Sequence, residues 1–188
     1  MDASGDFSQL LADNLRLQEA IHQAQIGATG ADARALAESM RQAFVVGSMR
    51  FLIRYDEGSE LTEPLAIAML PGVPPWFLGV CNLHGLLTPV FDLVAYLGLP
   101  PKREARRTKR MLLVLGHGAE AAAIYIDGLP KNFYLRKAQA DNRPAPVPSE
   151  LQAHIRGVYD RDESSWWDLD VASLLAAIEA RLQQAQAV

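Results

Sequence analysis

The stretch that decides the fold is GVCNLHGLLTPVFD, residues 79–92. Residues 78–82 and 86–91 read as two strands, and His84 and Gly85 lie between them. Because glycine adopts positive φ without strain, Gly85 suits the tip of a tight hairpin. We therefore predict an antiparallel hairpin here, with His84 and Gly85 at its turn.

Short apolar segments with hairpin spacing extend from this stretch in both directions. Gly47-Ser48 and Gly116-His117-Gly118 mark two further turns, each between two such segments. The expected strands outside the central hairpin are residues 43–46, 49–54, 111–115, 121–126, 133–135, 155–159 and 165–169. In the segment 49–54, Met49, Phe51 and Ile53 alternate with other residues, which predicts one buried face. Many short strands with few helices between them favour a mainly β, barrel-type domain over a parallel sheet.

A helical arm is predicted before the strands. Residues 7–26 and 31–41 place apolar side chains at helical spacing. Two interpretations stay open, since such an arm could pack on its own domain or bind a partner as a helix. We expect residues 1–40 to form this extension, residues 41–182 the β domain and residues 183–188 a tail.

Two more helices are predicted within the β domain. The first is short, begins at Asp92, whose carboxylate suits capping, and ends at Gly98. The second is the C-terminal helix, which starts at about Val171 and is capped by Asp170. Its apolar face consists of Leu174, Leu175, Ile178 and Leu182.

The composition suits one cytoplasmic domain with an added arm. The chain has 188 residues, of which 49% are hydrophobic, a net charge of −4 and a single cysteine, Cys81. The net charge gives no global attraction to nucleic acid, and one cysteine forms no intrachain disulfide, which fits a reducing compartment. The first residues are acidic where a secretory signal would be basic.

One long uncharged stretch could be mistaken for a membrane span. Residues 64–91 contain no Asp, Glu, Lys or Arg. Prolines interrupt the stretch repeatedly, so a helix there could not keep its backbone hydrogen bonds in lipid. We expect buried strands and turns instead, and no insertion into a membrane.

Catalytic and metal chemistry find little support in the sequence. Cys81, His84 and Asp92 could suggest a thiol nucleophile with its base and orienting carboxylate. On a strand, however, residues 81 and 84 project from opposite faces, and a cysteine beside an apolar residue is usually a small core residue. The histidines are widely separated and no second cysteine supports a metal site. We predict no catalytic residue, no cofactor and no metal, and keep a cysteine-dependent hydrolase using Cys81 and His84 as the alternative.

Two segments could serve either structure or binding. The basic run at residues 102–110 reads as a solvated connector, with a docking surface for an acidic partner as the alternative. Trp76 and Phe77 follow a proline-rich approach and read as core residues. Apolar side chains left exposed at the rim of this segment would instead mark an interface.

The central stretch resembles the signature block of the CheW-like coupling proteins. In that family a proline-rich approach leads into a Gly-Val-x-Asn-x-Arg-Gly strand and turn, and then into a Pro-Val-x-Asp-Leu strand and helix; residues 71–93 are similar throughout. Residues 111–128 and 155–170 resemble the family's second hairpin and closing strands. The resemblance covers roughly residues 41–182 and leaves the arm outside.

The resemblance implies a fold and a role. Such domains consist of two small, SH3-like, five-stranded β-barrels packed together, and they carry no activity. They link the cytoplasmic tip of a methyl-accepting chemoreceptor to the regulatory domain of a CheA-type histidine kinase. This takes place at membrane-associated receptor arrays, including arrays at the cell pole. The wording of residues 71–79 is most similar to the version that serves type IV pili and twitching motility. The version that serves flagellar chemotaxis is the alternative.

The resemblance also implies a protein-interaction site. Its residues are Glu60, Trp76, Gly79, Asn82, Leu83, His84, Gly85 and Asp92. The family's turn usually carries an arginine that pairs with a glutamate, and this chain has His84 and Glu60 at the corresponding positions. We expect Gly79 to admit another backbone at a barrel-to-barrel contact, and Asp92 to act as a helix cap or, alternatively, as a contact residue.

Overall fold

The computed structural model describes residues 39–100, 110–135, 139–140, 147–161 and 163–186. The chain divides into two compact units, Met1–Met40 and Arg41–Val188, and the fold below is that of the second. The predicted helix at residues 7–26 and the basic run at 102–109 lie outside the described residues. The predicted helix at 31–41 ends too late, because strand β1 already begins at Met40.

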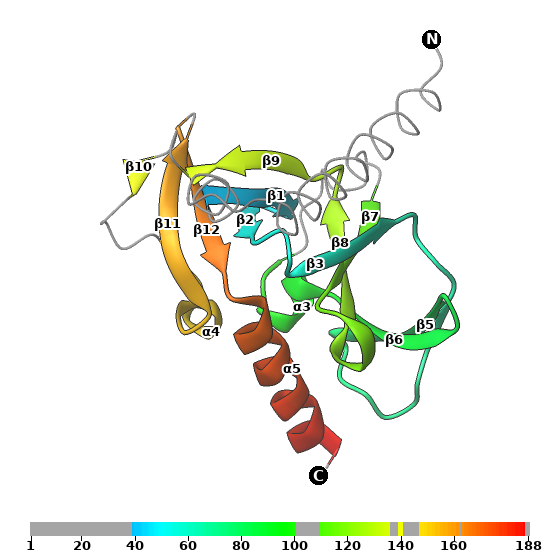
Figure 1. Cartoon of the computed structure of the whole chain (residues 1–188). Coiled ribbons are helices and arrows are strands. Elements are labelled where there is room, and N and C mark those ends of the chain that lie inside the picture. The colour runs from blue at the N-terminus through cyan, green and yellow to red at the C-terminus, as the bar shows by residue number, and fades with distance from the viewer. Residues whose placement is uncertain (1–38, 101–109, 136–138, 141–146, 162, 187–188) are drawn as a thin grey trace. The chain divides into compact units, whose positions relative to one another are not determined.

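The strands form two sheets, drawn on opposite sides of Figure 1. The first sheet, sheet A, has the order β10-β11-β12-β2-β1-β9. Its strands are β1 (Met40–Val46), β2 (Met49–Ile53), β9 (Lys131–Tyr134), β10 (Gln139–Ala140), β11 (Ile155–Arg161) and β12 (Ser164–Leu169). Strands β1 and β2 form the predicted hairpin, and β12 runs parallel to β2.

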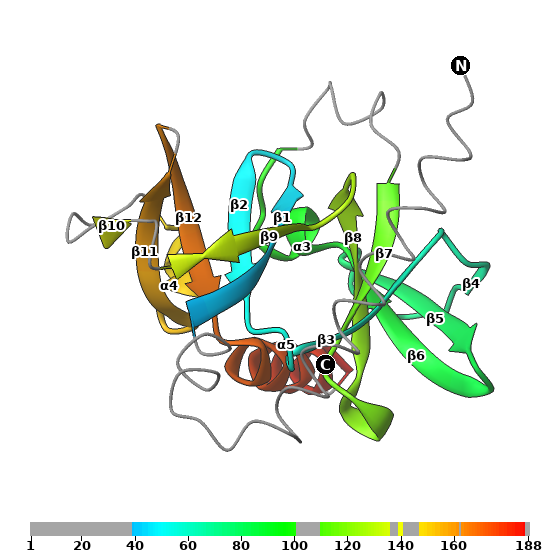
Figure 2. The same cartoon turned by 45° about the horizontal axis from the view of Figure 1, so that its top comes forward.

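The second sheet, sheet B, contains the central hairpin and has the order β3-β7-β8-β6-β5-β4. Its strands are β3 (Gly58–Thr62), β4 (Ile67–Ala68), β5 (Phe77–Leu83), β6 (Leu86–Phe91), β7 (Arg110–Leu115) and β8 (Ala122–Asp127). Figure 2 shows both sheets curling, with the β5–β6 hairpin extending away from sheet A.

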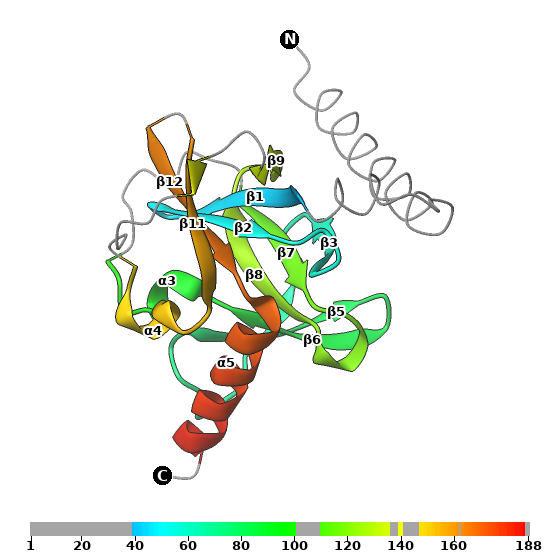
Figure 3. The same cartoon turned by 60° about the vertical axis from the view of Figure 1, so that its left-hand side comes forward.

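Few helices accompany the sheets. They are α3 (Leu93–Tyr96), the 3₁₀ turn η2 (Gly118–Glu120), α4 (Ser149–Gln152) and α5 (Val171–Gln186). Helix α5 (Figure 3) contacts two separate segments of the chain. Its Ser173 hydrogen-bonds to His154, just before β11, and its Arg181 donates to the carbonyl of Tyr96 on α3. It continues through residues 183–186, beyond the expected end of the domain.

The expected mainly β, CheW-like fold is confirmed, with one difference in the number of strands. Each sheet has six strands where five per barrel were expected. The two-residue strands β4 and β10 are among the additions, and strand β3 was also missed. Segments this short or this polar lack the alternation of apolar residues by which a strand is recognised in a sequence.

Strand β2 is buried more completely than its alternation suggests. Met49, Phe51 and Ile53 are buried as expected, but Leu52, which should face outward, is also fully buried. Leu52 packs in a second cluster with Ala43 of β1 and Phe133 of β9. The predicted buried face is therefore present, and the other face of β2 is also covered at Leu52, whereas Arg50 on that face is exposed.

The uncharged stretch is not buried throughout, which corrects the sequence interpretation. Its exposed large apolar side chains are Met69, Leu70, Leu86 and Leu87, with exposed fractions of 85%, 44%, 59% and 75%. Trp76 and Phe77 do lie in the core, as predicted. Within the described residues, we find no helix that is both long and apolar enough to cross a membrane.

Candidate functional site

The β5–β6 hairpin closes through the two-residue turn that its sequence predicts. Leu83 pairs with Leu86, so His84 and Gly85 form the whole loop. Their φ angles are +50° and +87°, the two successive positive values that a type I′ turn requires. The Asn82 side chain adds to the turn, because its Oδ1 accepts a hydrogen bond of 2.8 Å from the Gly85 N–H. The tip is thus a defined shape rather than a loose loop.

The tip is joined to the opposite edge of sheet B by a contact between two side chains. Nε2 of His84 lies 3.0 Å and 3.1 Å from the two carboxylate oxygens of Glu60 on β3. Strand β3 is the first strand in the sheet order, while β5 and β6 stand near its other end. The pair therefore bridges the two ends of the curled sheet, and the two residues expected to meet do meet.

Leu86 and Leu87 present apolar surface directly beside this pair. They follow the turn as consecutive strand residues, and Leu86 pairs with Leu83 whereas Leu87 pairs with Asn82. Consecutive side chains in a strand point to opposite faces, so the tip is apolar on both faces. Sequence reasoning missed these residues because an uncharged segment was read as buried. Two successive leucines after a turn were the available signal, since strand alternation sends one of them outward.

Gly79 sits where two strands approach closely. Its φ is +132°, and a Cβ there would overlap the carbonyl oxygen of Ala68 and lie 2.8 Å from Cγ2 of Ile67. The expected close approach of another backbone is present. The expected barrel-to-barrel contact is wrong, however, because the approaching backbone belongs to β4, the neighbouring strand of the same sheet.

The base of the hairpin is fixed by Trp76 and Asp92. The Asp92 N–H donates to the Trp76 carbonyl, and the Asp92 carboxylate accepts from the Ala95 N–H at 3.1 Å. Asp92 therefore caps α3, as the first interpretation had it. The Trp76 ring is 6% exposed and packs edge-on against Tyr96, with ring centroids 5.2 Å apart. Trp76, by packing in the core, and Asp92, by capping α3, therefore fix the base of the hairpin.

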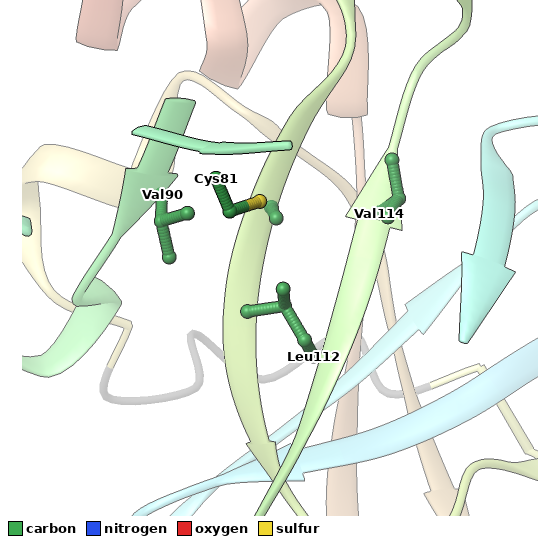
Figure 4. Packing of buried hydrophobic residues seen from close by; sticks show 5 residues of the cluster. Cys81, Val90, Leu112 and Val114 are labelled. Carbon is green, nitrogen blue, oxygen red and sulfur yellow. The ribbon is translucent and has the colours of Figure 1, made fainter. Parts of the chain in front are cut away.

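Cys81 points into the interior of sheet B (Figure 4). Its side chain is 2% exposed and packs against Val90, Leu112 and Val114. Burial raises the pKa of the Cys81 thiol, which disfavours the reactive thiolate. His84 bonds to Glu60 at the exposed tip instead, so the geometry does not provide a nucleophile with its base. In the described part of the chain, three or more metal-ligating side chains are nowhere grouped to hold an ion.

The β domain is similar to known proteins in both sequence and structure. Residues 42–179 match the model of the CheW-like domain family. The scaffolding protein CheW of Thermoanaerobacter tengcongensis has a similar structure, with a TM-score of 0.55 and 15% identity over 70% of this chain and 88% of that one. At this identity the structural match supports the fold.

Curated relatives extend the comparison to named proteins. PilI of Pseudomonas aeruginosa is 30% identical over 64% of this chain, and the chemotaxis protein CheW of Helicobacter pylori is 28% identical over 57%. The matched regions span 66% and 62% of those two relatives, which is less than two thirds of either. Since the family match extends over most of the described β domain, the chain belongs to the CheW-like domain family.

Proposed function

We propose that this protein is a non-catalytic adaptor that couples a chemoreceptor to a CheA-type histidine kinase in a chemosensory array. The observation that carries the proposal is the apolar hairpin tip. Leu86 and Leu87 are 59% and 75% exposed on a turn of defined shape, inside a domain of the CheW-like family. Exposed apolar groups on a rigid support are typical of a protein interface, because little conformational entropy is lost when they are covered.

The mechanism would be positional. An adaptor that holds a receptor and a kinase together raises the effective concentration of each for the other. It can also let the state of the receptor bias the state of the kinase, provided that the contacts differ between the two states. This mechanism requires well-formed surfaces and no reacting group, which agrees with a buried Cys81.

The pilus-linked pathway is the version we propose. The 30% identity to PilI supports it, as does the similarity of the proline-rich approach at residues 71–79. The protein would then act in the cytoplasm at membrane-associated receptor arrays and contribute to twitching motility. A flagellar-chemotaxis adaptor is the second candidate, favoured by the 28% identity to the CheW of Helicobacter pylori.

The interaction residues divide into two groups by their position. We propose that the first group forms the docking surface with Leu86 and Leu87: Glu60, Asn82, Leu83, His84 and Gly85. The second group would support that surface: Trp76 from the core, Gly79 at its contact with β4 and Asp92 as the cap of α3. Residues 41–182 would carry the adaptor function, with residues 1–40 as an extension.

Reconstitution from purified components tests the proposal. The full chain, a receptor cytoplasmic fragment from the pilus pathway and the regulatory domain of a CheA-type kinase are mixed, and complexes are measured by analytical ultracentrifugation. The variants Leu86→Asp and Leu87→Asp place a charge on the tip, and Ala176→Glu on the exposed side of α5 is the control. Because a charge at a hot spot must be desolvated, each tip variant should lose about tenfold or more in affinity for at least one partner.

The outcomes separate the alternatives. Binding of both partners by the native chain and the control, with loss in the tip variants, supports the adaptor. Equal binding by all four proteins would remove the hairpin tip from the interface. No binding to either partner would overturn the adaptor itself, and preference for a flagellar receptor fragment would favour the second candidate.

A further inference from the structure

We propose that the Glu60–His84 pair makes the hairpin tip a pH-sensitive docking element for the chemoreceptor, so that protonation of His84 tightens receptor binding. The inference rests on the proposed function, because it concerns the same tip. It goes further in assigning to one pair of side chains the control of affinity by proton concentration.

The geometry lets this pair contribute to the position of the tip. The turn itself is held by its own residues, because the Gly85 N–H donates a hydrogen bond to Oδ1 of Asn82. The contact between the tip and β3 is made by His84, whose Nε2 faces both oxygens of Glu60 at 3.0 Å and 3.1 Å. Leu83 packs on the core of sheet B, and the contact of His84 with Glu60 adds to this packing in holding the tip, with Leu86 and Leu87 beside it.

The charges around the pair are few among the described residues. The hairpin and β4 fall within residues 64–91, which carry no Asp, Glu, Lys or Arg. On β7, Glu60 is opposite Val114, and the cation of that strand, Arg110, lies over the Tyr125 ring at 4.5 Å. On β8, Asp127 accepts from the Gly47 N–H. Glu63 follows β3 with an interaction of its own. His84 is thus the side chain among residues 82–87 that can gain a proton and a positive charge.

The chemistry of imidazole supplies the direction of the effect. A neutral ring can donate one hydrogen bond to a carboxylate, whereas a protonated ring adds a full positive charge to the same contact. The side chain of His84 is 76% exposed, so the charged pair is worth little in the free protein. A partner that covers Leu86 and Leu87 would exclude water and strengthen the charged pair. Partner binding and proton binding are then linked, and each favours the other.

His84 also distinguishes this chain from the family pattern, in which an arginine stands at this position. Arginine keeps its charge at all physiological pH values and would hold the tip constantly. Histidine at the same position makes the contact adjustable. We expect affinity to increase about threefold between pH 8 and pH 6, the size of effect typical of a partly exposed ion pair.

The experiment compares binding of a purified receptor fragment at pH 6 and pH 8 by isothermal titration calorimetry. Four full-length chains are used: the native sequence, His84→Arg, Glu60→Gln and His84→Asn. Asparagine tolerates positive φ, so His84→Asn keeps the turn while removing the titrating ring. We expect the native chain to bind more tightly at pH 6, His84→Arg to bind tightly at both values, and the other two to bind weakly without pH dependence.

Three results would count against the proposal. Equal affinity of the native chain at both pH values overturns it, and so does equal affinity of the native chain and His84→Arg for the receptor fragment at pH 6 and at pH 8. A pH dependence that persists in Glu60→Gln would assign the effect to a contact other than this pair. Failure of every chain to bind would instead overturn the proposed function.

A measurement on the free protein distinguishes failure of the pH-sensitive pair from failure of the proposed adaptor function. The carboxyl carbon resonance of Glu60 is followed by NMR between pH 8 and pH 6 in the native chain and in His84→Asn. A resonance that moves in the native chain only supports the coupled pair, even when no partner binds. A resonance that stays constant in both shows that the pair does not respond to pH.

Discussion

The carbonyl group of Ala68 on β4 occupies the space where a side chain on Gly79 of β5 would begin. The two strands pair directly, with Ala68 opposite Val80, and β4 is only two residues long. The absence of a side chain at Gly79 thus lets the very short edge strand β4 pair with the hairpin. It also makes Gly79 a position at which the β5–β6 hairpin is sensitive to substitution.

Gly79→Ala should destabilise the fold strongly. The new Cβ would overlap backbone atoms, which cannot move aside as a flexible side chain does, and φ of +132° is strained for alanine. We expect a loss of about 2 kcal/mol or more in the free energy of unfolding, measured by urea denaturation. Gly72→Asn is the matched control, because Gly72 has φ of +70° with nothing within 4 Å, and asparagine accepts such angles. Equal losses in the two variants would contradict the steric explanation.

Cys81 should react slowly with alkylating reagents in the native protein. Its thiol is 2% exposed and its pKa is raised by burial, so both access and thiolate concentration are low. The rate of iodoacetamide modification at pH 8 should rise by orders of magnitude when the protein is unfolded in guanidinium. Native reactivity as fast as that of the unfolded chain would revive a thiol nucleophile at this position.

The parts of the fold that sequence predicts well are those with local signals. The strands expected at residues 78–82 and 86–91 are observed as Phe77–Leu83 and Leu86–Phe91, because His84 and Gly85 determine the turn and hence the register. Asp92 and Asp170 likewise indicate where the two helices that they cap begin. In each case, neighbouring residues in the chain supply both the signal and its effect.

The rest depends on residues that are distant in the chain. Strand β3 is polar, contains a register shift between Gly58 and Glu60, and is a strand only because it pairs with β7. The exposure of Leu86 and Leu87 depends on which distant parts of the chain lie over them, and strand alternation indicates only that one of the two faces outward. Glu60 was expected beside His84 through the family resemblance alone, since neither residue by itself indicates the other.

Asp170 should make part of the stability dependent on pH. Its carboxylate accepts a hydrogen bond from the Ser173 N–H and lies near Arg156, and both contacts lower its pKa. A lowered folded-state pKa stabilises the fold above the ordinary value of about 4, and this stabilisation is lost as pH falls through the lowered value. Asp170→Asn keeps a capping oxygen but removes the charge, whereas Asp170→Ala removes both.

We therefore expect Asp170→Ala to lose about 1 kcal/mol at pH 7, and Asp170→Asn to lose less. The difference between the native chain and Asp170→Asn should shrink as the pH is lowered from 7 to 3. Urea midpoints at several pH values measure both effects, and Glu179→Gln on the exposed side of α5 is the control. A native advantage over Asp170→Asn that persists unchanged at pH 3 would be inconsistent with a lowered pKa.

The buried pair of Arg41 and Asp168 should be costly to break from one side. Nε of Arg41 lies 3.0 Å from Oδ1 of Asp168 and Nη2 lies 3.1 Å from Oδ2, and the two residues are 6% and 2% exposed. Asp168→Asn removes this counter-charge from the buried guanidinium, and removing one partner of a buried ion pair typically costs about 3–5 kcal/mol. Arg156, 3.5 Å from Asp168, would lose a partner as well.

Removing both charges should cost less than removing one. The double variant Arg41→Met with Asp168→Leu removes both charges of this pair, so the loss should be smaller than in Asp168→Asn. Urea denaturation of the two single variants, Arg41→Met and Asp168→Leu, and of the double variant gives the coupling energy between the two positions. Additive losses would mean that the two side chains act independently. A coupling well above 1 kcal/mol is what a buried bidentate pair between β1 and β12 requires.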